Sequence, residues 1–287
     1  GDLTSFLLIS LVRAGAFGSL PELSPSTCTL CLCPLLVAVA MIAGAFYIPH
    51  PDKRPLGEDA YFISTGDGVI GVADGVGGWR EKGIDAGKFA RELMCRSESL
   101  VGRWPCGITD PMKILERALS ETTAKGTATA CIIALKGKWL HAAVVGDSGF
   151  AVVREDKVIY RSPQQQKRFN RPYQLGRANP RDPPLDALRI TSAVEVGDLV
   201  VAGSDGLFDN MFDRELVDVV VRSRREGRQR PDDLAFDIAL EAFKFSTDEG
   251  RRTPFSEAES REAGQPRTGG KMDDITVVVA RVVCVCD

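Results

Sequence analysis

Short runs rich in Val, Ile and Ala recur along this chain of 287 residues and constrain its fold more than any other feature. Several of them, over residues 127–135, 139–145, 150–154 and 158–160, are separated only by a few turn residues. Runs this close together pair as antiparallel neighbours, because a parallel crossover needs about a dozen residues or more. We therefore predict an antiparallel meander between residues 127 and 160.

Strand and helix signals alternate along the rest of the chain. Further strands are predicted over residues 43–48, 69–73, 198–202 and 275–285. Helices are predicted to open at Asp85, Asp110, Asp213 and Asp232. Two polar segments, 162–189 and 247–271, are predicted to be loops, the second of them mobile. Because strands group together with helices beside them, we predict an α+β fold: a four-layer α-β-β-α sandwich with two central, mainly antiparallel sheets flanked by helices.

The beginning of the chain is unusually apolar. Residues 23–51 contain no Asp, Glu, Lys or Arg. Their continuously apolar part, residues 35–48, is shorter than the roughly 20 residues that a membrane-spanning helix needs. We expect residues 1–40 to be an apolar leader or the remnant of an anchor, and residues 41–287 to form one folded domain. A membrane anchor stays open as the alternative that we favour less.

The charge balance excludes several classes of function. Lys and Arg total 36 against 39 Asp and Glu, whereas a nucleic-acid-binding domain normally shows a clear basic excess. Apolar residues make up 44% of the chain, enough for a sizeable core, which excludes a disordered protein. His50 and His141 are the two histidines, so the chemistry must rest mainly on carboxylates, hydroxyls or thiols.

The cysteines leave one alternative open. Cys28, Cys31 and Cys33 could bind a metal ion together with Cys284 and Cys286. Both clusters lie in apolar runs, and cysteine is a good small core residue, so we favour reduced thiols.

Acidic residues recur at the ends of predicted strands. The motifs are Glu58-Asp59, Asp74, Asp205 and Asp273-Asp274. A carboxylate at the end of a buried strand is held rigidly at the rim of the sheet, and several that converge there repel one another unless they are protonated or neutralised by cations. An oxygen-only site without histidine selects hard ions such as Mg²⁺ or Mn²⁺. One Asp-Gly alone is more often a turn signal, but the repeated layout favours a site with two metal ions that activates water against a phosphoryl group.

The order of these motifs resembles the metal-dependent type-2C protein Ser/Thr phosphatases. The resemblance covers roughly residues 43–285 and includes Thr127-Ala-Thr-Ala130 and Gly146-Asp147-Ser148 beside the acidic motifs. The sequences Ala-Asp-Gly-Val-Gly-Gly-Trp, Asp-Gly-Leu-Phe-Asp-Asn and Lys-Met-Asp-Asp-Ile-Thr are similar to the organellar branch of that family, found in mitochondria and chloroplasts. The resemblance implies a β-sandwich flanked by helix pairs, with a centre of two metal ions at one end, and it makes residues 41–287 the catalytic domain.

The resemblance assigns the direct metal ligands residue by residue. Asp74 would bridge both ions, and the backbone carbonyl of Gly75 would complete one coordination shell. Asp205 and Asp273 would be the remaining carboxylate ligands. Asp74, Asp205 and Asp273 would thus be the catalytic residues, acting through a metal-activated water on phosphoserine and phosphothreonine, with no phosphoenzyme.

The resemblance also implies roles for residues that are not direct ligands of the two ions. Glu58 and Asp59 would bind metal-coordinated waters or a nearby ligand, and Asp147 would hold an additional, weaker metal ion. Arg54, four residues before Glu58, would contact the substrate phosphate, with Lys53 as its substitute. The segment around Arg54 differs from the family pattern, and a solvated basic pair is the alternative.

One position departs from the wider family. Many members carry His after the first Asp-Gly as the acid that protonates the leaving oxygen, whereas this chain has Val76. The organellar branch shares a nonpolar residue there, so we expect an active enzyme. The alternatives are a pseudophosphatase that binds phosphoproteins and a two-metal nuclease, the latter disfavoured by the balanced charge. We expect two Mg²⁺ or Mn²⁺ ions with room for a third, phosphoprotein substrates, no nucleic-acid partner, a monomer, and a mitochondrial or plastid location.

Overall fold

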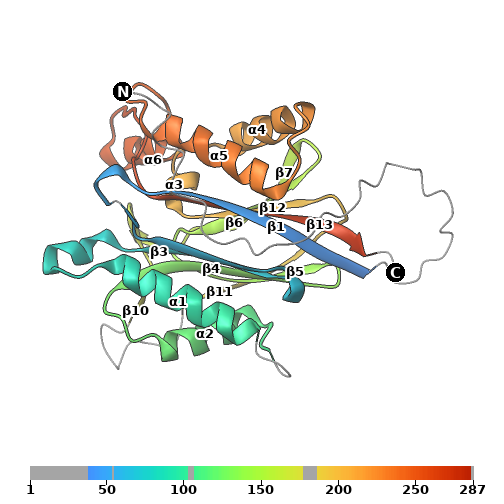
Figure 1. The fold of residues 1–287 in the computed structure, drawn as a ribbon. Coiled ribbons are helices and arrows are strands. Elements are labelled where there is room, and N and C mark those ends of the chain that lie inside the picture. Colours follow the sequence, from blue (N-terminus) through green and yellow to red (C-terminus); the bar gives the residue numbers. More distant parts are fainter. Residues whose placement is uncertain (1–37, 54, 103–106, 177–185, 286–287) are drawn as a thin grey trace. The chain divides into compact units, whose positions relative to one another are not determined.

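The computed structural model describes residues 38–53, 55–102, 107–176 and 186–285, and the following concerns those residues. Two antiparallel sheets pack face to face, and helices cover the outer face of each sheet (Figure 1). The predicted α+β sandwich of four layers is confirmed. Each predicted strand is present, with ends that match the predicted ones or differ from them by a few residues.

The first sheet joins the two ends of the described chain. Its order is β1 (Ala38–Ile48), β13 (Ile275–Val285), β12 (Leu199–Gly203), β6 (Gly149–Arg154) and β7 (Lys157–Arg161). β1 and β13 are in register along their full length, from Ala38 opposite Val285 to Ile48 opposite Ile275. The segment predicted as a strand over 43–48 is therefore the second half of a longer strand.

The second sheet comes from a more continuous part of the chain. Its order is β11 (Leu188–Ala193), β5 (Trp139–Val145), β4 (Thr127–Lys136), β3 (Val69–Gly75) and β2 (Asp59–Ser64), and β10 (Leu175–Gly176) also pairs with β4. A separate small hairpin is formed by β8 (Gln166–Arg168) and β9 (Arg171–Pro172).

The predicted meander over residues 127–160 is wrong in one respect, because it is divided between the two sheets. β4 pairs with β5 in the second sheet, whereas β6 pairs with β7 and β12 in the first. The chain crosses over at Gly146, whose φ of 87° lies in the region that favours glycine. β6 is apolar on both faces: Phe150 packs between the sheets and Val153 packs toward the helices. A strand of that kind must be covered on both sides, which a continuing meander at a sheet edge would not provide.

Helix pairs cover the outer faces of the two sheets. α1 (Ala86–Val101) and α2 (Pro111–Glu121) lie on the second sheet, and α4 (Asp213–Arg225) and α5 (Pro231–Ser246) lie on the first. The side chains of Asp85 and Asp110 accept hydrogen bonds from the first-turn N–H groups of α1 and α2, as predicted. Asp213 and Asp232 instead lie within the first turns of their helices.

Three apolar layers hold the sandwich together. One lies between the sheets and includes Phe150, Ile133 and Val278, all without exposed surface. The second lies under α1 and α2, and the third lies under α4 and α5. Burial of apolar surface in these layers supplies the main stabilisation of the fold.

The two segments predicted as loops contain regular structure. α6 (Pro254–Ala263) lies in the stretch predicted to be mobile. Outside these two segments, other connections contain the short elements η2 (Pro51–Lys53), η3 (Thr65–Asp67), η4 (Gly77–Lys82) and α3 (Asp205–Phe208). α6 begins with a capping box between Thr253 and Ser256 and ends at Gly264 in the left-handed conformation. Within α6 Ser256 is the buried residue, so the helix has no apolar periodicity that a pattern could detect. β8, β9 and β10 lie in the other predicted loop.

The predictions for the N-terminal segment fall largely outside the described residues. This holds for residues 1–37 of the expected leader, for Cys28, Cys31 and Cys33, and for Cys286. Within the described ranges, no helix combines the length and the apolar character needed to cross a membrane.

Phe150→Ala tests the layer between the sheets. Phe150 has no exposed surface, so we expect its truncation to lower the free energy of unfolding by about 3–5 kcal/mol. Trp139→Ala is the control, since Trp139 is 51% exposed and its loss should change stability by about 1 kcal/mol or less. Urea unfolding followed by fluorescence compares the variants, and equal losses for both would contradict the proposed core.

Candidate metal centre

The acidic motifs converge at one end of the sandwich. Asp59 at the start of β2 lies opposite Asp74 in the register of β3, and Asp205 begins α3 directly after β12. The two sheets are bonded to each other here: the Thr276 hydroxyl donates to Asp59 Oδ2 at 2.7 Å. The sequence motifs that were expected to meet at the sheet rims therefore do meet.

Asp274, directly before β13, binds the segment that connects β1 to β2. Its fully buried carboxylate accepts hydrogen bonds from the N–H of His50 at 2.8 Å, from the N–H of Glu58 at 3.0 Å and from the Tyr47 hydroxyl at 3.0 Å. With its oxygens used in this way, Asp274 positions the segment before β2. Its neighbour Asp273 is the more exposed member of the pair.

The glycines after two of the aspartates permit close backbone contacts. A Cβ on Gly75 would lie 2.7 Å from the carbonyl oxygens of Glu58 and Ala86. A Cβ on Gly206 would lie 2.0 Å from the carbonyl oxygen of Asp274. The Asp-Gly pairs are thus more than turn signals, because the elements that carry the acids could not approach with any larger residue.

The buried carboxylates raise one another's pKa. Burial first, and then the charges of Asp59 and Asp205, hold the pKa of Asp74 well above its ordinary value. Burial also holds the pKa of Asp205 well above its ordinary value, although the charge of Lys271 lowers it. Burial, followed by the charge of Asp274, raises the pKa of Asp59 to about 7. Burial and a neighbouring carboxylate raise the pKa of Asp147 to about 6.

Within the described part of the chain, two lysine ammonium groups lie among these acids, and Lys53 carries the first. Its Nζ lies 2.9 Å from Glu58 Oε2, 2.8 Å from Asp273 Oδ1 and 3.1 Å from Asp274 Oδ2. Burial alone would lower the pKa of Lys53, but Asp273 and Asp274 raise it above its ordinary value. Lys53 was predicted as the substitute for Arg54 at the substrate phosphate, and its contacts here are to carboxylates. Arg54 lies outside the described residues.

Lys271 is the second ammonium group. It contacts Asp205, lies 2.9 Å from Asp209 Oδ2, and lies 3.7 Å from Asp273 Oδ2. Burial opposes the charge of Lys271, but the three carboxylates raise its pKa well above the ordinary value. Although burial opposes it, the two lysines lower the pKa of Asp273.

The roles of Lys271 and Asp209 were not predicted from the sequence. Both stand in motifs that were recognised, Lys-Met-Asp-Asp-Ile-Thr and Asp-Gly-Leu-Phe-Asp-Asn, where only the first or paired aspartates were assigned. Their position inside those motifs was the available signal. Arg80 was also missed: its exposed guanidinium lies 3.6 Å from Glu58 Oε1 at the rim.

The donor set fits hard divalent cations. One buried oxygen each of Asp59, Asp147 and Asp205 has no hydrogen-bond partner among the described residues. Such atoms are costly unless a cation neutralises them, and oxygen-only sets suit Mg²⁺ or Mn²⁺. Within the described ranges, no three Asp, Glu, His or Cys side chains are arranged closely enough to form a metal site by themselves. The ammonium groups of Lys53 and Lys271 lie between the carboxylates instead.

Several known proteins are similar to this chain in sequence. No family model matches it. The probable protein phosphatase 2C 80 of Arabidopsis thaliana is 46% identical over 267 residues, which are 92% of this chain and 63% of that protein. The putative protein phosphatase 2C 24 of Oryza sativa subsp. japonica is 41% identical over 253 residues, which are 86% of this chain and 78% of that protein. The chain belongs to the protein phosphatase 2C family.

A solved structure agrees with this membership. The X-ray structure of the photosystem II phosphatase PBCP is 38% identical to this phosphatase 2C chain, with a TM-score of 0.77. The match covers 84% of this chain and 98% of that one. The family resemblance drawn from the motifs is confirmed, and so is the sandwich architecture. The chain spans 63% of the length of the Arabidopsis relative.

Protonation of the buried acids predicts a pH dependence for this phosphatase 2C chain when a chelator keeps metal away. The pKa of Asp59 rises from 3.8 to about 7 on folding, so the folded chain holds more protons than the unfolded chain between those values. Its stability should therefore fall as the pH rises through that window, and Asp59→Asn should flatten the slope.

Urea unfolding midpoints between pH 5 and 8 in EDTA measure this slope. The control is Asp156→Asn, which removes an exposed carboxylate from the turn between β6 and β7 and should leave the slope as it is. A midpoint that rises from pH 5 to 7 would contradict the buried repulsion.

Lys271→Met should destabilise the metal-free protein by about 3–5 kcal/mol, because it removes the cation between buried carboxylates and roughly keeps the volume. Added Mn²⁺ should restore more stability to this variant than to the wild type. Melting temperatures with EDTA and with Mn²⁺ give the comparison. Lys244→Met removes an exposed lysine and is the control. Equal melting in EDTA for Lys271→Met and wild type would show that Lys271 is no counter-ion.

Proposed function

We propose that this protein is a Ser/Thr protein phosphatase that hydrolyses phosphoserine and phosphothreonine in phosphoproteins. The observation that carries the proposal is the convergence of Asp74, Asp205 and Asp273 at one end of the sandwich, next to buried oxygens with no partner in the described ranges. Membership in the protein phosphatase 2C family supports the same activity.

The direct metal ligands proposed are Asp74, the carbonyl of Gly75, Asp205 and Asp273. Two Mg²⁺ or Mn²⁺ ions held there would supply Lewis acidity, lowering the pKa of a bound water and polarising the phosphoryl group. Asp74 would contact both ions, since it lies close enough to Asp205 and Asp273 for their charges to raise its pKa.

Further residues are proposed to complete the centre. Glu58 and Asp59 would orient waters around the ions, and Asp147, with one unpaired buried oxygen, would take part in a third and weaker site. Lys53 and Arg80 would bring positive charge to the rim, where the substrate phosphate must enter. Val76 has no proton to give, so protonation of the leaving oxygen falls to another group.

No observation favours a second function. A pseudophosphatase would be expected to lack one or more of the ligand acids, and all of them are present. The nearly balanced charge does not favour a nuclease. We propose that the protein acts as a monomer on phosphoproteins. A plastid location is supported by the photosystem II phosphatase among the similar structures, and a mitochondrial one has no such support.

The function is tested by phosphate release from a phosphoserine peptide with Mn²⁺, with Mg²⁺ and with EDTA. Asp74→Asn and Asp205→Asn should each lower kcat by about 100-fold or more, since each removes a proposed metal ligand. The matched control is Asp218→Asn, an exposed position on α4 that should keep wild-type activity. Activity that survives EDTA or both ligand substitutions would exclude this mechanism, and no metal-dependent release on any phosphopeptide would favour a binding module.

A further inference from the structure

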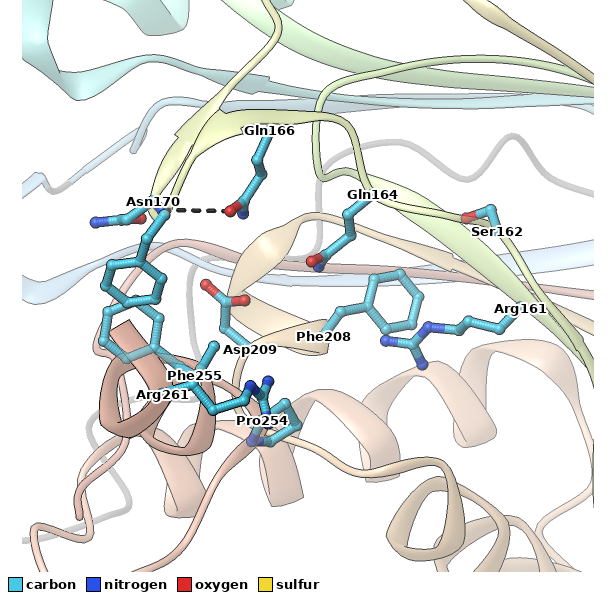
Figure 2. A pocket seen from close by; sticks show the side chains of 12 residues that line it. Arg161, Ser162, Gln164, Gln166, Asn170, Phe208, Asp209, Pro254, Phe255 and Arg261 are labelled. Atoms are coloured by element: carbon cyan, nitrogen blue, oxygen red, sulfur yellow. Dashed lines mark hydrogen bonds between the residues drawn. The ribbon is translucent and has the colours of Figure 1, made fainter. Parts of the chain in front are cut away.

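A pocket of about 320 Å³ has Asp209 in its wall (Figure 2). It lies beside the carboxylate cluster, which is formed by Asp59, Asp74, Asp147, Asp205 and Asp273. Its wall comes from the β8–β9 hairpin, from the segment that follows β7, from the end of α3 and from α6. The volume is at the small end of ligand pockets, which hold roughly 300–1,000 Å³. The α6 and hairpin walls both lie outside the two-sheet core, where sequence variation leaves the fold intact.

Among the described residues that line the pocket, the arginines differ in whether their charge is paired. Arg161 lies over the Phe208 ring at 3.9 Å and donates to Asp213 at 2.6 Å, so its charge is already paired. Asp209, at the centre of the pocket, accepts from Lys271 at 2.9 Å. Arg261 has no ion pair or hydrogen bond within the described ranges and is exposed.

Neutral polar groups line the side of the pocket opposite Arg261. Gln164, Gln166 and Asn170 present amide groups above Asp209 in Figure 2, and Arg261 lies below it. Amides both donate and accept hydrogen bonds, so they suit a polar ligand of either sign, and the unpaired guanidinium selects an anion.

Hydrogen bonds and a ring contact hold α6 against the neighbouring segments. The Phe255 N–H donates to the Asp209 carbonyl at 2.9 Å, and the Thr253 hydroxyl donates to the Gly269 carbonyl at 2.9 Å. Phe255 also packs on Phe169 with ring centroids 5.3 Å apart. These contacts fix the start of the helix that carries Arg261, which lowers the entropic cost of binding.

The pocket adjoins the carboxylate cluster at two points. Asp209 shares Lys271 with Asp205, and the Gln166 amide donates to Asp147 Oδ2 at 3.2 Å. An extended peptide advances by about 3.3–3.6 Å per residue. A peptide whose phosphate reaches the cluster can therefore place a nearby side chain in this pocket.

We propose that the pocket is a specificity subsite for an anionic side chain that flanks the phosphorylated residue of the substrate, with Arg261 as its recognition residue. This inference rests on the proposed phosphatase function. The anion is a carboxylate of Asp or Glu or a second phosphate, since a free guanidinium pairs with either.

Phosphopeptides test the subsite. One phosphoserine peptide is varied at each position from three before to three after the phosphoserine, with Glu, Gln, Lys or a second phosphoserine, and kcat/KM is measured with Mn²⁺. At one position the wild type should favour Glu or phosphoserine over Gln by about three- to fivefold, the range of a partly exposed ion pair. The Glu and phosphoserine arms distinguish the two sources of negative charge.

Variants of Arg261 assign the preference to this pocket. Arg261→Ala should abolish the ratio between acidic and neutral peptides, and Arg261→Glu should reverse it in favour of Lys at the same position. Arg252→Ala is the matched control, because Arg252 is an exposed arginine before the same helix that pairs with Glu257 outside the pocket, and it should keep the wild-type ratio.

Hydrolysis of p-nitrophenyl phosphate by the wild type separates the two proposals. If that hydrolysis depends on metal but no position shows an acidic preference, or if Arg261→Ala keeps the preference, the subsite is overturned and the phosphatase function stands. If neither p-nitrophenyl phosphate nor any peptide is hydrolysed, both proposals are overturned.

Discussion

Repulsion among buried carboxylates at one end of the sandwich is the constraint on which the rest of the structure depends. Each acid is held at the end of a strand or the start of a helix, so none can move away to relieve the repulsion. The fold therefore has to bring positive charge to the cluster, and Lys53 and Lys271 do so in the protein alone. Divalent cations at the proposed metal centre would neutralise a repulsion that the backbone maintains.

The sequence allowed the layers and the acids to be predicted, because both follow from local patterns. Short runs rich in Val, Ile and Ala predicted the strands, and the acids at their ends predicted the cluster, since strand ends on two packed sheets share a rim. The helix caps at Asp85 and Asp110 could be predicted as well, because a cap depends only on the next few residues of the chain.

The remaining features depend on contacts between distant segments, which no local pattern records. The transfer of β6 into the other sheet depends on β12, far along the chain, which pairs with it. Lys271 acquires its role only because α3 brings Asp205 and Asp209 beside it. α6 buries little apolar surface and is held by hydrogen bonds to neighbouring segments, so periodicity could not reveal it or the pocket beside it.

The pairing of β1 with β13 has a consequence for how the protein is made. The second sheet and its helices draw on an early, nearly continuous part of the chain and can assemble while synthesis proceeds. The first sheet has to wait, because its inner strand β13 leaves the ribosome after the other described strands and both β1 and β12 pair with it. Until then β1 is an apolar strand with a free edge, the kind of surface that aggregates or recruits chaperones. The time needed to translate the residues between β1 and β13 therefore sets how long the first sheet stays incomplete.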